Sequence, residues 1–284
     1  RFLISEQIYM NNVLVTGAGG QLGSELKRLE RNYPNYNIFF ADKSELDITN
    51  YTSVKKFLKK NKINFIINCA AYTQVEKAEF EVELANKINH LAVANIAHLA
   101  KQESIKLVHI STDYVFDGNT KKPYLESDET NPLSVYGKTK LDGELAIKKI
   151  NPKNSIVIRT SWLYSKSGKN FYSTMIRLSR VNDHINVVSD QKGSPTNAKD
   201  LATTILKILP KIDNSSVEIY HYSNDGACSW YDFAKKIFES NRIDVILKAV
   251  KSADYSDRVN RPIYSVLNTS LIKNKFDIKI PNWE

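Results

Sequence analysis

The sequence has little cysteine and no long apolar run, and both absences narrow the class of protein. Cys69 and Cys228 are the only cysteines in 284 residues. They lie far apart without metal-ligand spacing, so neither a disulfide framework nor a zinc site is predicted. No apolar stretch approaches the ~20 residues that cross a bilayer, and the opening RFLISEQIY lacks the apolar core of a secretory signal. We therefore expect a cytoplasmic protein without a membrane partner, whose fold starts near Met10.

Positive charge is in excess, but it is not gathered in one place. The chain has 40 Lys and Arg against 31 Asp and Glu, a formal charge of +9. Its lysines are scattered, and even KKFLKKNK at 55–62 is typical of the solvated end of a helix. The charge favours small anionic partners such as a phosphorylated molecule, and no nucleic-acid partner is predicted.

Short apolar runs alternate with longer amphipathic stretches over the first 160 residues. The runs are rich in Val, Ile and Phe, and helical patterns join them, which predicts parallel strands buried on both faces. The predicted fold class is α/β, with a doubly wound parallel sheet of the Rossmann type. Its expected strands are NVLVTG, NIFFAD, NFIINCAA, KLVHIST and SIVIRTSW.

A glycine loop follows the first of these runs and opens the first helical stretch. In TGAGGQLG, Gly17, Gly20 and Gly23 have the GxxGxxG spacing, and Gly17 and Gly19 also match the start of GxGxxG. Glycines let the backbone approach a pyrophosphate at a helix N-terminus, and this strand-to-helix context makes the motif informative. The sequence therefore predicts a nicotinamide dinucleotide, NADPH or NADH.

The second run ends in a residue pair that bears on the choice of cofactor. Asp42 is near the ~20-residue offset at which an acidic residue binds the adenosine ribose, and its charge would repel a 2′-phosphate. Lys43 beside it could attract that phosphate, so the preference stays open. At the end of the third run, small Ala70 and Ala71 could admit a cofactor closely or could pack against a helix.

Regularity weakens after Trp162, where NAKDLATTILKIL and EIYHYS are the remaining clear helix and strand patterns. We expect residues 10–163 to form the dinucleotide-binding domain, with 196–223 returning to it. Residues 164–195 and 224–284 would form a smaller α/β substrate-binding lobe. Such a lobe closes over the carboxyl ends of the strands, where ligands bind in this architecture.

Three polar residues suggest an active site beside the expected nicotinamide. In VYGKTKLDGE, Tyr136 and Lys140 are i and i+4 and leave the same helix face. An ammonium near a phenol stabilises the phenolate and lowers the pKa of the tyrosine. Thr112, at the end of the fourth run, adds a hydroxyl, although a helix cap or a turn is an equally ordinary use of threonine.

Together the glycine loop, STDYVF, YGKTK and RTSWLY resemble the extended short-chain dehydrogenase/reductase family, and in particular its reductases of nucleotide-linked 4-keto sugars. DQKGSPT (190–196) and NRPIYSVLN (260–268) resemble substrate-lobe segments of those reductases. The resemblance runs from Met10 to near the C-terminus. It implies an enzyme that transfers a hydride from NADPH or NADH to a sugar ketone, in the synthesis of deoxysugars for cell-surface polysaccharides.

The resemblance also implies roles for individual residues. Tyr136 would donate the proton, Lys140 would bind the nicotinamide ribose, and Thr112 would stabilise the developing oxyanion. Asp113 and Trp162 would contact the sugar, while Arg258 and Arg261 would clamp the diphosphate or remain solvated surface groups. The predicted cofactor-binding set is Gly17, Gly19, Gly20, Gln21, Leu22, Gly23, Asp42, Lys43, Asp47, Ile48, Ala70, Ala71, Tyr72, Tyr136 and Lys140.

Two other functions share these motifs. Nucleotide-sugar 4,6-dehydratases usually carry Glu where this chain has Tyr114, and the missing acid disfavours water elimination. A regulatory subunit of methionine adenosyltransferase keeps a similar YGKTK segment, but it differs around RTSW. An epimerase fits RTSWLY and GSPT less well. The sequence therefore favours a reductase over a binding protein.

Other properties stay open at this stage. Some relatives bind Mg²⁺ at a dimer interface, but no metal ligands are predicted here. The expected assembly is a monomer or a homodimer. Relatives usually continue into a final helix beyond KIPNWE, at the end of this sequence.

Overall fold

The computed structural model describes residues 10–166, 168–254 and 259–284. A sheet of six strands forms its centre, in the order β10-β5-β4-β3-β1-β2, with every neighbouring pair parallel. The predicted Rossmann-type α/β fold is confirmed, and each of the six expected strands is present. The strands are β1 (Asn11–Thr16), β2 (Tyr36–Ala41), β3 (Phe65–Asn68), β4 (Lys106–Thr112), β5 (Ile156–Thr160) and β10 (Glu218–Tyr222).

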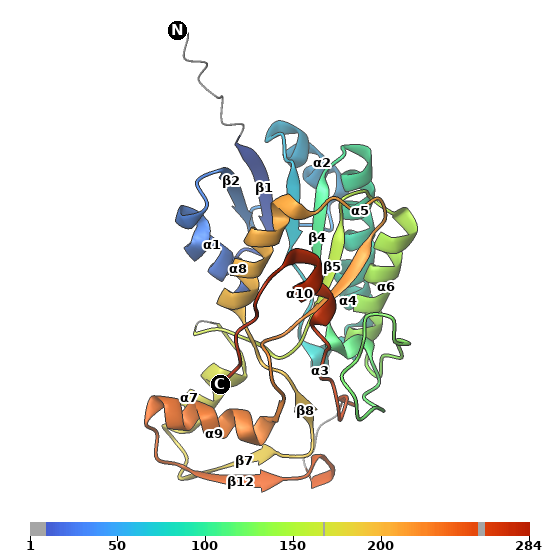
Figure 1. Cartoon of the computed structure of the whole chain (residues 1–284). Coiled ribbons are helices and arrows are strands. Elements are labelled where there is room, and N and C mark those ends of the chain that lie inside the picture. Colours follow the sequence, from blue (N-terminus) through green and yellow to red (C-terminus); the bar gives the residue numbers. More distant parts are fainter. Residues whose placement is uncertain (1–9, 167, 255–258) are drawn as a thin grey trace.

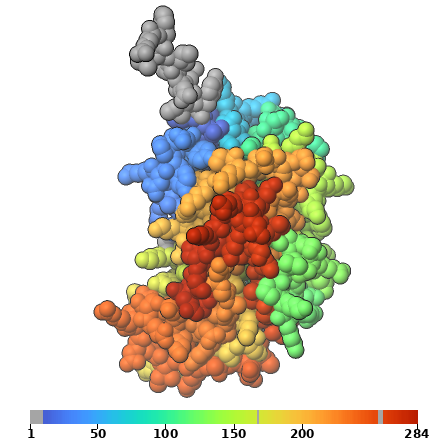
Figure 2. All heavy atoms as spheres, viewed as in Figure 1, coloured from blue at the N-terminus to red at the C-terminus, as the bar shows by residue number. Residues whose placement is uncertain are grey.

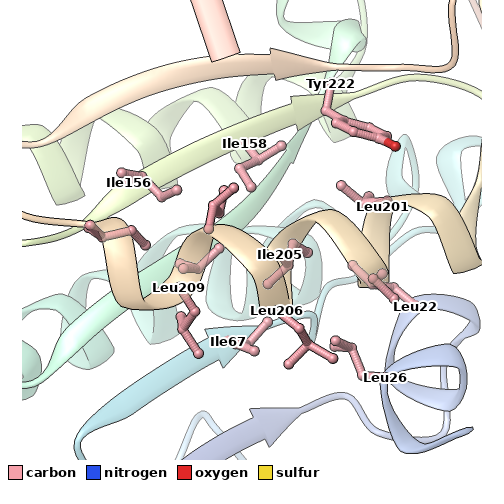
Figure 3. Packing of buried hydrophobic residues seen from close by; sticks show 14 of the residues in the cluster. Leu22, Leu26, Ile67, Ile156, Ile158, Leu201, Ile205, Leu206, Leu209 and Tyr222 are labelled. Atoms are coloured by element: carbon pink, nitrogen blue, oxygen red, sulfur yellow. The ribbon is translucent and has the colours of Figure 1, made fainter. Parts of the chain in front are cut away.

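Helices cover both faces of this sheet, because alternate strand residues point to opposite sides. Val13 and Val15 face a core formed with α1 (Gln21–Leu29), α8 (Ala198–Ile208) and α10 (Ser270–Phe276). Figure 3 shows Leu22 and Leu26 of α1 beside the apolar face of α8. Leu14 faces the opposite core, formed with α2 (Tyr51–Lys60), α5 (Ala92–Gln102) and α6 (Val135–Ile150).

The helix that covers ELANKINHLAVANIAHLAK is continuous but not uniform. It runs through α4 (Val82–Asn86), a π-helical turn (Lys87–Leu91) and α5. The preceding short helix is α3 (Val75–Ala78). Asn89 in the π turn is fully buried and hydrogen-bonds both the backbone of Tyr72 and the hydroxyl of Thr139 in α6. A π turn widens the helix locally, and here it accompanies a buried polar contact with the neighbouring helix.

A smaller unit lies below the sheet in Figure 1. Helices α7 (Phe171–Leu178) and α9 (Trp230–Asn241) pack there against the parallel pair β7 (His184–Val188) and β12 (Ile246–Val250). These elements have their own apolar core around Phe233 and Ile237. Two-residue strands complete the connections: β6 (Leu163–Tyr164), β8 (Lys192–Gly193), β9 (Thr196–Asn197) and β11 (Cys228–Ser229).

The C-terminal segment joins the two cores. Ile272 and Phe276 of α10 pack into the core beside the sheet, whereas Trp283 packs edge-on against Phe233 of the smaller unit. Asp225 holds the segment through Lys273 Nζ at 2.5 Å and through the backbone of Trp283. Figure 2 shows this dark red stretch lying across the front of the molecule between its upper and lower parts.

Candidate active site

A cavity of about 1120 Å³ lies between the carboxyl ends of the strands and the smaller unit. Gly17, Cys69 and Ser161 line it, and each directly follows a strand of the sheet. Met175 of α7 and Trp230 of α9 line the opposite side. Strand order reverses between β1 and β3, and ligands of open α/β sheets bind beside such a reversal.

The glycine loop forms a cradle in which side chains would not fit. Gly17 has a φ of +64°, and a Cβ there would lie 2.7 Å from the backbone of Ala70. At Gly23 a Cβ would lie 2.6 Å from Gly17 O. Gly20 precedes α1, and no described side chain caps its first turn. The N–H groups of that turn can therefore bind a pyrophosphate, so the residues present fit a dinucleotide.

Asp42 and Lys43, which follow β2, have different surroundings. Oδ1 of Asp42 accepts hydrogen bonds from Ser44 N, Ser44 Oγ and Glu45 N, which together hold the pKa of Asp42 below its usual value. It orders this turn and is not among the cavity-lining residues, whereas Lys43 is. The arrangement favours a cofactor with a 2′-phosphate.

Most other predicted cofactor residues lie along the cavity. The lining residues among them are Gly19, Gln21, Leu22, Asp47, Ile48, Ala70 and Ala71. Tyr72 is the exception besides Asp42, because it is buried and its hydroxyl donates to Glu81. Gln21 also has a contact that the sequence does not predict: its Oε1 accepts from Asn170 Nδ2 at 2.8 Å, joining the glycine loop to the segment before α7.

Thr112, Tyr136 and Lys140 converge on the same cavity, as the sequence predicts for neighbouring elements. Ser134 caps α6 by accepting from Gly137 N. A Cβ at Gly137 would lie 2.2 Å from the carbonyl oxygen of Tyr114, so glycine is required for the helix to approach the turn after β4. This close approach places Tyr136 next to that turn.

Lys140 is a buried side chain, not a solvated surface lysine. It is 2 % exposed, and its Nζ donates to Ile110 O at 2.6 Å. Burial lowers the pKa of Lys140 to about 8, against the opposing charge of Glu144. The side chain thus lies beneath the cavity with its charge only partly compensated.

Tyr136 behaves differently from the sequence-based expectation. Burial raises its pKa above the ordinary value, and a hydrogen bond with Thr112 opposes that rise. The Lys140 amine is engaged with the backbone of β4 and does not offset the effect of burial. Tyr136 therefore holds its proton at neutral pH, which suits a proton donor.

Asp113 carries a buried carboxyl beside this cluster. Thr112 Oγ1 donates to its Oδ1 at 3.1 Å, while Oδ2 has no hydrogen-bond partner among the described residues. Burial raises the pKa of Asp113 to about 6. Thr112 also caps the short turn Asp113–Val115 by accepting from Tyr114 N, so the capping role and the cavity position coincide.

Trp162 lines the cavity, but its ring is already packed. Its indole stacks on Trp230 with ring centroids 3.5 Å apart and an angle of 7° between the planes. Gly193 lies against the same indole, since a Cβ there would be 2.4 Å from Cε2. Trp162 has a φ of +46°, a left-handed backbone conformation that is costly for a bulky residue. Trp162 can offer a sugar an edge of the indole, while Trp230 covers one ring face.

Of the two arginines expected at the diphosphate, the structure describes only Arg261. Arg261 lines the cavity, where it donates to the Tyr114 hydroxyl at 3.1 Å and pairs with Glu76 at 3.3 Å. Glu76 is exposed, so this ion pair is weak and an anionic ligand can compete for the guanidinium. Arg258 lies outside the described residues.

The smaller unit supplies lining residues that the sequence reasoning missed. They include Lys169, Asn170, Phe171, Met175, Asn186, Gln191 and Trp230. They come from segments far apart in sequence, so no local spacing connects them. Only the DQKGSPT segment, which includes Gln191, pointed to this side of the cavity.

Two absences bear on the class of site. Within the described ranges, no three His, Cys, Asp or Glu side chains gather where they could hold a metal ion. None of the helices in those ranges has the length and apolarity to cross a membrane.

Comparisons with known proteins agree with this geometry. The chain is 40 % identical to dTDP-4-dehydrorhamnose reductase of Aggregatibacter actinomycetemcomitans, over 97 % of this chain and 96 % of that protein. It is 36 % identical to a dTDP-4-keto-6-deoxy-D-glucose reductase of Streptomyces niveus, covering 89 % and 87 % of the two chains.

A solved structure matches equally well. A crystal structure of dTDP-4-dehydrorhamnose reductase from Bacillus anthracis, in complex with NADP, superposes with a TM-score of 0.91. It shares 40 % identity and covers 96 % of this chain and 95 % of its own. The model of the RmlD substrate binding domain family matches residues 10–284. The resemblance to reductases of nucleotide-linked sugars is thereby confirmed, and the chain belongs to the RmlD substrate-binding-domain family.

Proposed function

We propose that this protein is an NADPH-dependent dTDP-4-dehydrorhamnose reductase, which reduces the C4 ketone of dTDP-4-dehydro-L-rhamnose to the alcohol of dTDP-L-rhamnose. The observation that carries the proposal is the convergence of Thr112, Tyr136 and Lys140 on a cavity that also contains the glycine cradle. Catalytic groups and cofactor seat thus share one space. Relatives named as reductases of dTDP-sugar ketones support the same reaction.

The nicotinamide cofactor supplies a hydride when it is bound, and the protein supplies the rest of the chemistry. Tyr136 keeps its proton at neutral pH and donates it to the oxygen of the former ketone. An alkoxide is a far stronger base than a phenolate, so this transfer is downhill. The Thr112 hydroxyl lies beside Tyr136 and can hydrogen-bond the same oxygen as negative charge develops.

Buried charge prepares the site for a neutral sugar with hydroxyl groups. Ser265 lowers the pKa of Asp113 through a side-chain hydrogen bond, but Oδ2 has no close partner among the described residues and can accept a hydrogen bond from a sugar hydroxyl. Arg261 is positioned to exchange Glu76 for an anionic group of the substrate. The two residues would fix the sugar and the adjoining anionic group, respectively.

Neither alternative function has comparable support. Elimination of water requires an acid where this chain has Tyr114, whose hydroxyl instead accepts from Arg261. A regulatory, non-catalytic role does not require Thr112 and Tyr136 to meet in a cavity. Another nucleotide-sugar reductase is the closer alternative, because the Streptomyces relative acts on a different 4-keto sugar by name.

The direct test is oxidation of NADPH or NADH by the purified protein, with dTDP-4-dehydro-L-rhamnose generated in place. Substrate-dependent oxidation and a dTDP-L-rhamnose product are expected. Dinucleotide binding without any oxidation would contradict the proposal. Oxidation with the D-configured 4-keto sugar alone would assign the protein to the alternative substrate.

Replacing Lys43 with Ala tests the choice of cofactor. Lys43 lines the cavity whereas the Asp42 carboxylate is held in its turn, so Lys43 should bind the 2′-phosphate. Loss of one charge-assisted contact should raise the KM for NADPH about tenfold and leave that for NADH unchanged. Steady-state KM values for both cofactors measure this. Lys56→Ala removes an exposed lysine of α2 as the matched control, and equal changes in both cofactors' KM values would refute the assignment.

Replacing Asp113 with Asn tests the substrate contact. With a pKa of about 6, Asp113 loses its acceptor charge as the pH falls through 6, so the KM for the sugar should rise in acid. The variant should have a KM about tenfold higher at pH 7.5 and should lack this acid dependence. KM values between pH 5 and 8 measure both effects. An unchanged acid limb in the variant would assign the titration to another group.

We also propose the division of the chain that the sequence suggested. Residues 10–163 with 196–223 would bind the dinucleotide, and 164–195 with 224–284 would bind the substrate. Pairing of β10 with β5 supports the return of the chain to the first unit. A cytoplasmic monomer or homodimer without a nucleic-acid partner remains the proposed working form.

A further inference from the structure

Four buried polar side chains form a line from β1 through β3 and β4 to helix α6. Nζ of Lys140 lies 3.3 Å from Nε2 of His109, whose Nδ1 lies 3.0 Å from Nδ2 of Asn68. Oδ1 of Asn68 accepts from Thr16 Oγ1 at 2.6 Å. The four side chains are 2 %, 0 %, 1 % and 2 % exposed, respectively. We call them the Thr16–Lys140 chain.

Strand register, not chance contact, creates this chain. Thr16 of β1 is paired with Asn68 of β3, and Asn68 is paired with His109 of β4. Side chains at paired positions lie on the same face of a sheet and touch their neighbours. Burying a polar group is costly unless it forms a hydrogen bond. Asn68 and His109 each contact two members of the chain, and the end residues Thr16 and Lys140 also hydrogen-bond the backbone. A hydrophobic core does not require such a chain of buried polar groups. We therefore look for its function at Lys140, the residue that lies at the active-site end.

We propose that His109 is a positioning residue that holds Lys140 in its buried place and links the charge of Lys140 to the direction of hydrogen bonding along the Thr16–Lys140 chain. The expected effect on turnover rests on the proposed function. The effect of His109 on Lys140 does not depend on it.

Donor and acceptor chemistry gives the chain two directions. An ammonium only donates, so a charged Lys140 requires His109 Nε2 to accept and Nδ1 to carry the hydrogen. Asn68 must then present its oxygen to His109 and its amide N–H to Thr16. When Lys140 is neutral, every donor reverses: Thr16 donates to Asn68, Asn68 to His109, and His109 to the amine. Thr16 permits both directions because a hydroxyl donates and accepts.

Other ionisable groups also surround Lys140, and they set the background for its titration. Glu144, one turn further along α6, raises its pKa and is itself bound by Arg159 of β5. Cys69, directly after β3, also raises the pKa of Lys140. Tyr136 shares its helix face. His109 is distinguished from these by direct contact with Nζ on a chain that can reverse.

The test follows the titration of Lys140 itself. In protein labelled with ¹³C at lysine Cε, the Lys140 resonance is identified by its loss in Lys140→Met and followed by NMR from pH 6 to 11. His109→Leu removes the acceptor, so the pKa of Lys140 should fall by about one pH unit. His109→Gln restores a side-chain acceptor and should return the pKa of Lys140 most of the way to its wild-type value. The buried His221 of β10, bonded to Tyr124 O, offers a matched control: His221→Leu should leave it unchanged.

The same variants are then compared by turnover. The high-pH limb of kcat/KM should move to lower pH in His109→Leu by the same interval and recover in His109→Gln, with about a fivefold loss at pH 8 in the former. A Lys140 titration that is identical in His109→Leu and the wild type would overturn the proposal, as would a Gln variant that behaves like Leu. If His109→Leu does not fold, Asn68→Leu should give a smaller shift in the same direction, and no shift there would overturn it. A wild type without turnover would refute the proposed reaction, while the NMR titration would still decide the role of His109.

Discussion

A Tyr136→Phe variant should bind NADPH normally and lose most of its turnover. Removing a positioned proton donor lowers kcat by about 10²- to 10⁴-fold, because water must then protonate the forming alkoxide. Binding should survive, since Phe keeps the ring that packs edge-on against Tyr114 at 5.6 Å. Single-turnover kinetics with the 4-keto sugar, together with NADPH titration by fluorescence, measure both quantities.

A second tyrosine separates this effect from the loss of any hydrogen-bonded tyrosine hydroxyl. Tyr172 of α7 donates to Asn241 at 3.1 Å, and it is not among the residues that line the cavity. Tyr172→Phe should change kcat less than twofold. A Tyr136→Phe protein that retains more than a tenth of wild-type kcat would show that another group delivers the proton. Because burial raises the pKa of Tyr136, its own deprotonation should not limit turnover between pH 6 and 9.

The sheet was predictable because its signal is local. Each strand is a short apolar run, and parallel strands buried on both faces need little more than that pattern. The glycine loop was predictable for a related reason: strand, turn and helix are consecutive, so sequence order fixes their geometry. Thr112 and Tyr136 lie 24 positions apart, yet the strand–helix order sufficed to bring both to the same edge of the sheet.

Long-range packing determined what the sequence could not show. Asp42 occupies the position expected of a ribose ligand, and Oδ1 of its carboxylate also accepts hydrogen bonds from Ser44 and Glu45. Trp162 was expected to contact a sugar, and Trp230, 68 positions later, covers one face of its ring. The effect of Lys140 on Tyr136 depended on where the amine points, and Ile110 O holds it. In each case a further partner, which pattern reasoning does not see, contacts the side chain.

Replacing Lys140 with Met should reduce activity and increase stability at neutral pH. The variant would lose the proposed charge-assisted contact to the cofactor ribose and the cation beneath the site, so kcat/KM should fall about 100-fold. Met fills a similar volume without a charge to bury. The pKa of Lys140 falls from 10.5 in the unfolded chain to about 8 in the folded protein, which corresponds to about 3 kcal/mol. A gain of up to that size in the free energy of unfolding is expected.

The pH dependence of this gain distinguishes a buried charge from better packing. Between pH 8 and 10.5 the unfolded chain binds a proton that the folded protein does not, so wild-type stability rises with pH across that window. Below pH 8 the full penalty is present, and above 10.5 it is gone. The advantage of Lys140→Met over the wild type should therefore be largest near pH 7 and vanish toward pH 10.5, as measured by urea unfolding at each pH. A constant advantage would indicate packing alone, whereas a less stable variant at pH 7 would mean that the contacts of Lys140 with Ile110 and His109 outweigh the cost of burying its charge.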